Sequence, residues 1–296
     1  MESLLPAIRD LIPEAAEIES ESAIGGSSFS STSRLVIRNQ DGSHRRVFLK
    51  AGHLDQRLAF DCERRGLELL SQSQTIATAV PIGVTTSQDR AIFLAELIET
   101  GQRDAQFYDR FGHDLACLHR STKGTQIGLD HDNFLGVAPQ LNTAKSSWLD
   151  FVAECRLGHQ IRLGRQNRVL SAQLQRDVES IIDRLPDLLA GREDVTSLLH
   201  GDLWSGNLMC DSKQRPVIID PAVYYGCREA EWGMIKLFGG CPPSSLAAYQ
   251  SVWPFPDGWQ RRVDVYVLVH LLNHLNIFGV SYADQCQDVA GSLLSA

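Results

Sequence analysis

Three polar residues in the second half of the chain have the types and spacing that phosphoryl transfer requires. Asp202 lies in a polar stretch behind an apolar pair, Asn207 follows five positions later, and Asp220 ends a short apolar run after a turn. Phosphoryl transfer uses one carboxylate to orient and deprotonate the attacking hydroxyl, while a second carboxylate and an amide oxygen hold Mg²⁺ against the phosphates. We therefore predict Asp202 as the catalytic base and Asn207 and Asp220 as Mg²⁺ ligands.

Asp and Asn are also common in ordinary loops, because their side chains bond the neighbouring backbone. An isolated Asp and Asn at this spacing would usually be structural. Here His200 and Gly201 precede the Asp, apolar runs flank the segment on both sides, and Pro221 follows the second Asp. The combination favours the functional interpretation.

The segments around these residues resemble the catalytic and metal-binding loops of the protein-kinase-like small-molecule phosphotransferases. Residues 200–207, His-Gly-Asp-Leu-Trp-Ser-Gly-Asn, and 220–226, Asp-Pro-Ala-Val-Tyr-Tyr-Gly, are similar to the fructosamine kinase (ketosamine-3-kinase) family, with the Trp-Ser pair as the specific part. The resemblance covers nearly the whole chain. It implies ATP-dependent phosphorylation of the 3-hydroxyl of a ketosamine, a sugar joined to an amine by glycation, whose unstable product loses the sugar and restores the amine.

Two further residues are assigned to the acceptor site. Trp204 lies two positions after the predicted base, where an indole could offer a sugar ring an apolar face and one N–H donor. Packing beneath the catalytic loop is an equal alternative for this side chain. Glu231 stands where members of the family often have Asp, so its carboxylate lies one methylene further out.

The N-terminal part contains a Gly- and Ser-rich stretch followed by two predicted strands, 35–37 and 47–50, which a turn at 39–42 joins. Such a stretch alone is typical of a plain loop. A Gly-rich turn that leads into a hairpin and a strand Lys is also the arrangement that covers nucleotide phosphates in kinases. The resemblance places Gly25 and Gly26 in this loop, with Ser27 as an added donor. Some family members have a Cys there, which this chain lacks, so no redox switch built on that Cys is expected.

Lys50 ends the second strand, and Glu63 follows thirteen residues later in a predicted helix, 60–70. Kinases pair a strand Lys with a helix Glu, which holds the ammonium against the α- and β-phosphates. Glu63 matches the family position better than the alternative, Glu68. The strand-like run 91–98 then predicts a hinge between lobes, where backbone at Glu96 and Ile98 would meet the adenine.

The remaining pattern is mainly helical. Apolar residues recur at helical spacing near the N-terminus and in the second half of the chain, and the predicted helices are 4–12, 105–120, 147–165, 171–185, 229–240 and 263–279. We therefore predict an α+β, bilobal, protein-kinase-like fold. Residues 1–98 would form an antiparallel β N-lobe that binds the nucleotide phosphates, and residues 99–296 a mainly helical, catalytic C-lobe with ATP in the cleft between them.

Histidines elsewhere in the chain have less specific patterns. His119 ends a predicted core helix and is interpreted as structural. His131 has an Asp on each side, which could indicate a metal site, but hydrated loops have the same composition. His270 and His274 are one helical turn apart and form a possible metal pair, yet they lie on an apolar stripe without an adjacent Glu, so packing is favoured.

Composition excludes several classes of protein. The 296-residue chain has a net charge of −8 and a pI near 5.6, so neither a nucleic acid nor an anionic membrane is an expected partner. Seven scattered cysteines without C-x-x-C spacing favour neither a zinc site nor a disulfide framework. No signal peptide or membrane span is recognisable, and the cytoplasm is the expected location.

Two other functions remain open at this point. A kinase of the same fold could act on another alcohol, such as an aminoglycoside, because the negative net charge does not exclude a polycationic acceptor. A pseudokinase could bind nucleotide or a partner without catalysis, although retention of the four polar groups at positions 50, 202, 207 and 220 argues against it. The preferred sugar and amine, a free or a protein-bound substrate, and the oligomeric state do not follow from the sequence.

Overall fold

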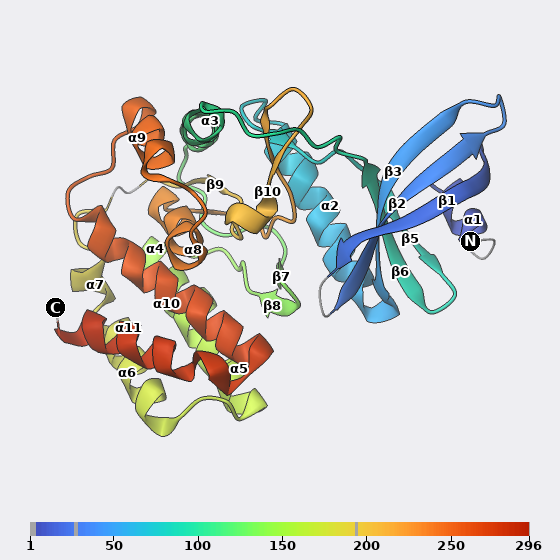
Figure 1. Cartoon of the computed structure of the whole chain (residues 1–296). Coiled ribbons are helices and arrows are strands. Elements are labelled where there is room, and N and C mark those ends of the chain that lie inside the picture. Colours follow the sequence, from blue (N-terminus) through green and yellow to red (C-terminus); the bar gives the residue numbers. More distant parts are fainter. Residues whose placement is uncertain (1–3, 27–28, 193–194, 296) are drawn as a thin grey trace.

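The computed structural model describes residues 4–26, 29–192 and 195–295 and has two lobes (Figure 1). A five-stranded antiparallel sheet, in blue to teal, forms the N-terminal lobe, and helix α2 runs from it toward the C-terminal lobe, where helices dominate. The predicted bilobal α+β arrangement is confirmed. Nowhere in the described ranges is a helix both long enough and apolar enough to cross a bilayer.

The N-terminal sheet has the strand order β1-β2-β3-β6-β5. Its strands are β1 (Ala15–Gly26), β2 (Ser30–Asn39), β3 (His44–His53), β5 (Pro81–Ser87) and β6 (Arg90–Glu96). Beside them lie α1 (Leu5–Arg9), the 3₁₀ turn η1 (Leu54–Gln56), α2 (Arg57–Ser71) and β4 (Ala77–Thr78).

Alternation along β3 places the predicted strand Lys. Val47 and Leu49 are buried against the N-terminal helix on one face of the sheet, while Phe48 and Lys50 line the cleft on the other. Successive side chains on a strand point to opposite faces, so an apolar core on one face forces Lys50 toward the cleft. The two predicted strands of this hairpin are confirmed and extend further than predicted.

Strand β1 was not predicted. Glu and Ser alternate over residues 19–22 of this strand, and Ala15 and Ile18 are its buried members among the described side chains. An edge strand needs few apolar residues because one edge and one face meet water, so its hydrophobic signal is weak. Gly25 and Gly26, expected in a loop, instead close this strand and pair with Thr32 and Ser31.

The C-terminal lobe contains helices and short strands. The helices are α3 (Phe107–Ser121), α4 (Trp148–Phe151), α5 (Gly158–Asn167), α6 (Ala172–Asp183), α7 (Leu185–Leu188), α8 (Glu231–Phe238), α9 (Pro243–Val252), α10 (Trp259–Phe278) and α11 (Ala283–Ser295). The strands are β7 (Asn133–Leu135), β8 (Ala138–Gln140), β9 (Ser197–Leu199), β10 (Leu208–Cys210), β11 (Pro216–Ile218) and β12 (Tyr224–Gly226). A π-helical turn, η2 (Val152–Leu157), joins α4 to α5, and the 3₁₀ turns are η3 (Ser205–Asn207), η4 (Arg228–Ala230) and η5 (Val280–Tyr282).

The two lobes share structure beyond a single linker. The short strand β4 pairs in parallel with β11 of the C-terminal lobe, and Leu70 and Ile76, which flank the end of α2, are buried in the large C-terminal core. The N-terminal sheet buries separate, smaller clusters. Division of the chain at residue 98 stays a prediction, and the contacts of β4 and α2 tie both sides of that boundary together.

Candidate active site

The catalytic loop begins where β9 ends and turns sharply at Gly201. This residue has φ +81°, and a Cβ there would lie 2.2 Å from the carbonyl oxygen of Ala222. Ala222 also fixes the residue before Gly201, because its amide donates a hydrogen bond to the carbonyl oxygen of His200 at 2.8 Å. Glycine is therefore required before Asp202, both for the left-handed conformation and for the close approach of the two chains.

Asp202 lines the cleft and is held by Asn207. The Asn207 amide nitrogen donates to the backbone oxygen of Asp202 at 2.8 Å and to its Oδ2 at 3.2 Å. The other carboxylate oxygen, Oδ1, is buried and has no hydrogen-bond partner among the described residues. Burial, reinforced by the charge of Asp220, raises the pKa of Asp202 to about 8. An acceptor oxygen is thus left open at the position predicted for the catalytic base.

Asn207 and Asp220 have the donor atoms that a hard cation prefers. Because the Asn207 nitrogen is bound to Asp202, its carbonyl oxygen is the atom that remains for a cation. Asp220 has φ +53°, a left-handed conformation that Asp tolerates better than most residues, and its side chain is 43% exposed. Burial acts to raise the pKa of Asp220, but Lys50 and Glu63 together hold it below its usual value. An anionic carboxylate, an amide oxygen and a nearby open carboxylate oxygen fit a Mg²⁺ ion.

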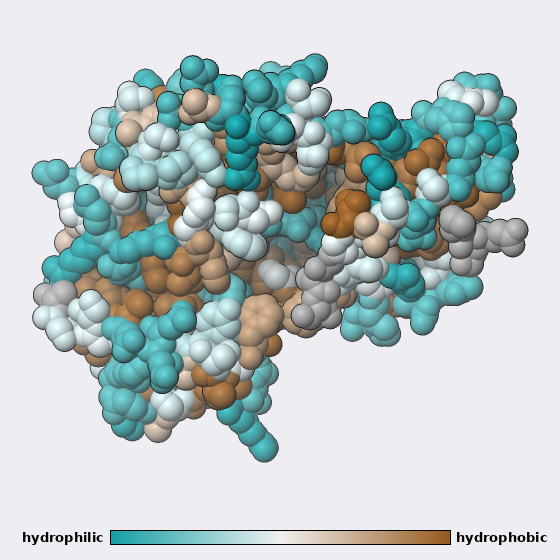
Figure 2. All heavy atoms as spheres, viewed as in Figure 1, coloured by the Kyte–Doolittle hydropathy of each residue, from teal (hydrophilic) through white to brown (hydrophobic). Residues whose placement is uncertain are grey.

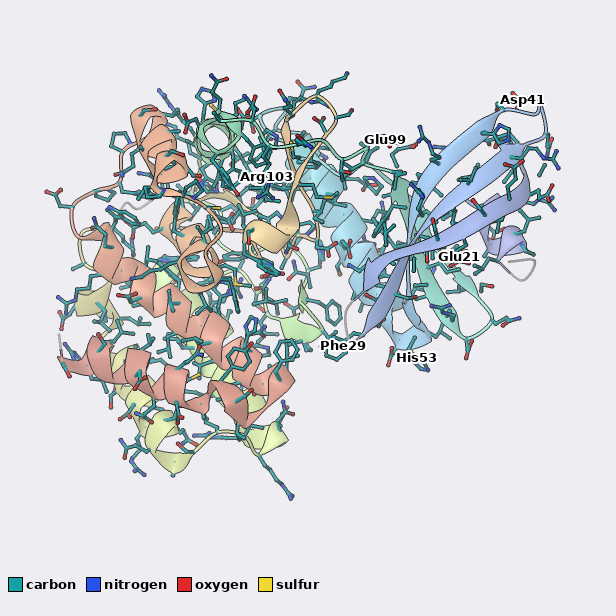
Figure 3. All side chains as sticks on the ribbon, viewed as in Figure 1. Glu21, Phe29, Asp41, His53, Glu99 and Arg103 are labelled. Carbon is teal, nitrogen blue, oxygen red and sulfur yellow. The ribbon has the colours of Figure 1, made fainter. Side chains whose placement is uncertain are left out.

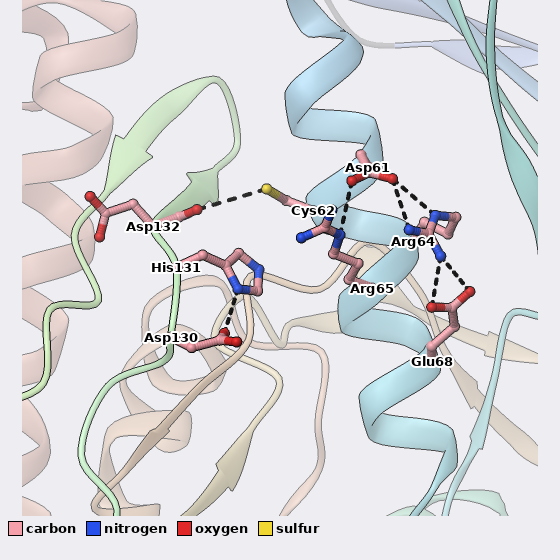
Figure 4. Close-up of polar contacts among 8 residues, drawn as sticks. All are labelled: Asp61, Cys62, Arg64, Arg65, Glu68, Asp130, His131 and Asp132. Atoms are coloured by element: carbon pink, nitrogen blue, oxygen red, sulfur yellow. Dashed lines mark hydrogen bonds and ion pairs between the residues drawn. The ribbon is translucent and has the colours of Figure 1, made fainter.

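Lys50 links the two lobes at the centre of the cleft. Its Nζ lies 2.8 Å from Glu63 Oε2 and 3.3 Å from Asp220 Oδ1. The alternative partner, Glu68, lies further along α2 and binds Arg64 at 2.7 and 2.8 Å instead (Figure 4). The structure therefore brings Lys50, Glu63 and Asp220 together and leaves Glu68 outside the site.

Glu231 is not placed at the acceptor site. Its side chain is fully buried at the start of α8 and is absent from the lining of the cleft. Its two oxygens accept the backbone amides of His200 at 2.6 Å and Gly201 at 3.0 Å. The predicted contact with substrate is corrected, because this carboxylate lies beneath the catalytic loop and fixes the backbone just before Asp202.

His200 connects the catalytic loop to the segment between β11 and Asp220. Its Nε2 lies 2.8 Å from the carbonyl oxygen of Ile219, and its Nδ1 lies 3.3 Å from the backbone nitrogen of Asp202. A carbonyl can only accept, so Nε2 carries the proton and Nδ1 accepts the amide. Burial lowers the pKa of His200 and favours this neutral form. His119 is also buried, 2.8 Å from the Tyr249 hydroxyl, which confirms its structural interpretation.

A cleft of about 1100 Å³ lies between the lobes, and Lys50, Asp202, Asn207 and Asp220 all line it. Figure 2 shows the hollow between the lobes, with apolar residues in tan and brown at its mouth. Aromatic side chains of the C-terminal lobe contribute much of this surface: Trp204, Phe238, His274, Phe278 and Tyr282. The sequence analysis did not identify these residues as functional, apart from Trp204. The recurrence of His274 and Phe278 one turn apart on α10 was the available signal.

The structure places Trp204 both at the cleft and against its own loop, and its contact with the acceptor stays a prediction. It lines the cleft, and its ring also packs 5.7 Å from that of Phe238, centroid to centroid. Its indole covers Gly206 so closely that a Cβ there would lie 2.4 Å from the ring. The side chain therefore supports its own loop and presents surface to the cleft.

The residues predicted to contact the nucleotide from the N-terminal sheet and the hinge lie next to the cleft lining or outside the described residues. Ser27 lies outside the described residues, and Gly25 and Gly26 adjoin residues that line the cleft, such as Thr32. The backbone N–H of Glu96 already donates to the carbonyl of Val80 at 2.8 Å, so it cannot meet a ligand. Ile98 packs in the cluster that contains Phe48 and Ile219, both of which line the cleft.

The three histidines considered as metal ligands, His131, His270 and His274, do not form a metal site among the described residues. His131 Nδ1 lies 2.6 Å from its neighbour Asp130 (Figure 4), and the described part of the chain has no cluster of three potential metal-binding side chains. His270 is buried, which lowers its pKa to about 3. His274 Nδ1 lies 2.8 Å from the carbonyl oxygen of His270, and burial lowers its pKa too, so both rings remain neutral near pH 7.

Comparison with known proteins gives consistent matches along the chain. Residues 2–296 match the family model described as fructosamine kinase. A probable ketoamine kinase of Synechocystis is 37% identical over 249 residues, which cover 84% of this chain and 83% of that protein. The chloroplastic protein-ribulosamine 3-kinase of Arabidopsis thaliana is 36% identical over 238 residues, 79% of this chain and 72% of that protein.

Solved structures show the same fold. A Thermobifida fusca protein assigned as a fructosamine-3-kinase aligns over the full length of both chains with a TM-score of 0.85 and 29% identity. A thermostable mutant of the aminoglycoside phosphotransferase APH(4)-Ia, in a ternary complex with AMP-PNP and hygromycin B, aligns with a TM-score of 0.68 and 13% identity over 97% of each chain. The latter likeness shows the kinase-like fold alone.

Proposed function

Because this chain belongs to the fructosamine kinase family, we propose that it transfers the γ-phosphoryl group of ATP to the 3-hydroxyl of a ketosamine of the fructosamine or ribulosamine type. The observation that carries this proposal is the arrangement of Lys50, Asp202, Asn207 and Asp220 around one cleft. Lys50 comes from the N-terminal lobe and Asp220 from the C-terminal lobe, and Lys50 Nζ lies 3.3 Å from Asp220 Oδ1. The chain is therefore a phosphotransferase with an alcohol acceptor.

In the proposed mechanism, the open Oδ1 of Asp202 accepts the proton of the attacking hydroxyl. The sugar oxygen then bonds to the γ-phosphorus while the bond to the β-phosphate oxygen breaks. Lys50, held by Glu63, contacts the phosphate oxygens. Asn207 and Asp220 would hold Mg²⁺, which when bound neutralises and orients the phosphates.

We also propose where the adenine and the phosphates bind and what biological role the reaction has. We place the adenine beside Ile98, Phe48 and Ile219, whose apolar cluster borders the cleft. Gly25 and Gly26, at the end of β1, would let the backbone approach the phosphates, with Ser27 as a further donor. The biological role would be removal of glycation adducts from amines, with the substrate either free or attached to protein and the enzyme in the cytoplasm.

An aminoglycoside acceptor is not favoured by the lining of the cleft. A polycation needs several carboxylates around it, whereas the C-terminal wall of the cleft beyond the catalytic loop is largely aromatic and apolar. The acidic residues among the lining residues are Asp55, Glu63, Asp202 and Asp220. Lys50 pairs with two of them, and Asp202 is the predicted base. The pseudokinase alternative conflicts with the complete set of catalytic groups in one cleft.

The decisive experiment is a direct assay of phosphoryl transfer. The protein is incubated with ATP, Mg²⁺ and either a fructosamine of N-acetyllysine or hygromycin B, and the products are identified by mass spectrometry and ³¹P NMR. We expect a phosphorylated fructosamine, lost in the Asp202→Asn variant although that variant still binds ATP. Turnover with hygromycin B alone would support another acceptor class, and nucleotide binding without any turnover would support a pseudokinase.

A further inference from the structure

A continuous row of aromatic rings runs from the catalytic loop to the mouth of the cleft. Trp204 contacts Phe238 at 5.7 Å between ring centroids, Phe238 contacts His274 at 4.8 Å, and His274 contacts Phe278 at 5.5 Å. Tyr282 adjoins the last two rings at 5.2 and 6.0 Å. All five side chains line the cleft, so the row is one surface that leads away from the reacting centre.

The N-terminal lobe reaches this row through Phe29. Its ring lies 6.3 Å from that of Phe278, centroid to centroid, and Figure 3 shows Phe29 at the end of the N-terminal sheet that faces the C-terminal lobe. Both side chains line the cleft, yet 40% of Phe29 and 51% of Phe278 remain exposed. Large apolar side chains that are half exposed at a cleft mouth indicate a surface that a ligand covers.

We propose that this aromatic row, with Phe29 and Phe278 at its outer end, binds the amine substituent of the ketosamine and determines which glycated amines are accepted. This inference rests on the proposed function. In a ketosamine the reacting 3-hydroxyl and the C1 amine are separated by three carbon atoms, so the substituent on nitrogen extends away from Asp202 in one direction. The polyhydroxyl tail of the sugar extends in the other.

Chemistry distinguishes these two ends of the acceptor. A secondary amine is protonated near pH 7, and a cation next to aromatic faces is stabilised by about 0.5–2 kcal/mol. The substituent beyond it is a hydrocarbon chain or ring, which gains by leaving water. A sugar tail with several hydroxyls would leave those groups without partners on an apolar wall. The aromatic row therefore matches the amine end of the acceptor.

The inner and outer rings have different expected roles. Trp204 and Phe238 also support the catalytic loop and α8, so changes there would mix structural and binding effects. Phe278 is the last residue of α10 and about half exposed, so its truncation should leave folding intact. Val280 offers a matched control, because it lies two residues later, is 71% exposed and does not line the cleft.

The test compares two acceptors that differ only on nitrogen. The same fructose is supplied as its methylamine and its benzylamine derivative, and kcat/KM is measured for the wild type and for Phe278→Ala, Phe29→Ala and Val280→Ala. We expect the wild type to prefer the benzylamine derivative. Phe278→Ala should lower kcat/KM for that compound about tenfold, a loss equivalent to about 1.4 kcal/mol, and change the methylamine derivative by less than about twofold.

Phe29→Ala should shift the preference in the same direction, whereas Val280→Ala should leave it unchanged. An equal loss on both acceptors in Phe278→Ala would overturn the proposal, because the row would then bind the sugar. A wild type without preference, or variants that keep the wild-type preference, would overturn it as well. Phosphorylation of neither compound would instead refute the proposed function, and the subsite with it.

Discussion

Glu231 offers the sharpest test of how the site is held together, because its buried carboxylate binds the backbone of the catalytic loop and also lies 3.5 Å from His119 Nε2 of α3. It accepts the amides of His200 and Gly201 at 2.6 and 3.0 Å. Glu231→Ala would leave two buried N–H groups without partners. At about 1–3 kcal/mol for each group, the protein should lose about 2–6 kcal/mol of folding free energy.

Glu231→Gln is the more informative variant, since it keeps the volume and one carbonyl oxygen. Its NH₂ group would face one of the two amide donors, so at least one hydrogen bond is lost, at a cost of roughly 1–3 kcal/mol. The melting temperature should fall by roughly 2–10 °C. Misalignment of Asp202 should lower kcat by about tenfold or more, with the roughly 10²–10⁴ that a general base contributes as the upper limit, and KM for ATP should change little.

Glu229→Gln is the matched control. Glu229 is equally buried on the turn just before α8, but it pairs with Arg262 at 2.7 and 2.8 Å and has no contact with the catalytic loop. Loss of the Glu229–Arg262 ion pair should destabilise the fold without lowering kcat per folded molecule. If Glu231→Gln retained wild-type kcat, or if both variants lowered kcat equally, the positioning role of Glu231 would be wrong.

The pH dependence of stability gives a second measurement of the same group. Burial acts to raise the pKa of Glu231, but His119, His200 and the backbone amide hold it below its usual value of 4.5. A carboxyl with a lowered folded-state pKa stabilises the protein fully above its unfolded pKa and loses this effect as the pH falls through the folded one. The difference in melting temperature between the wild type and Glu231→Gln should therefore be constant above about pH 6 and shrink below about pH 4.

Four further substitutions test the remaining groups of the site. Lys50→Met should lower kcat/KM for ATP at least about 100-fold, within the range for loss of one electrostatic contact, and unchanged kinetics would exclude a phosphate contact. Asp220→Asn should fold but require more Mg²⁺ for half-maximal rate, so normal turnover at low Mg²⁺ would refute the metal assignment. Gly201→Ala should destabilise the protein by at least about 2 kcal/mol, and an unchanged melting curve would contradict the strained turn. Trp204→Phe should raise KM for the ketosamine about tenfold with KM for ATP unchanged, whereas a uniform loss of kcat on every acceptor would assign the side chain to packing alone.

The sequence predicted the candidate residues that line the cleft better than the residue that fixes the backbone behind them. Asp202, Asn207 and Asp220 lie in one contiguous region with apolar strands around them, so local spacing already brings them close. The strand and helix patterns indicated Lys50 and two candidate partners, the family resemblance favoured Glu63 over Glu68, and the structure joins Lys50 to Glu63 at 2.8 Å. These predictions depended on the spacing of residues within short segments and on the resemblance of those segments to a family, both of which are read directly from a sequence.

The residues that the sequence analysis misassigned or missed have partners from distant parts of the chain. Glu231 follows Asp202 by 29 positions, and nothing in its local pattern shows that it turns inward to two backbone amides. The aromatic row gathers side chains from the catalytic loop and from helices α8 and α10. Its outer end also includes Phe29 of the N-terminal lobe. Such a surface exists only once the lobes and helices have packed together.

The site is assembled from two halves, one from each lobe, and they are held in place by different contacts. The C-terminal half is fixed internally, because His200 bonds both the Asp202 backbone and the strand before Asp220 while Glu231 holds the turn from below. Lys50 belongs to the N-terminal sheet and reaches this half through Asp220 at 3.3 Å. A change in the angle between the lobes would therefore alter the phosphate contact of Lys50 while leaving Asp202 and Asn207 in place. For this reason, we expect substitutions in the N-terminal lobe to affect ATP use first, and substitutions behind the catalytic loop to affect the rate with every acceptor.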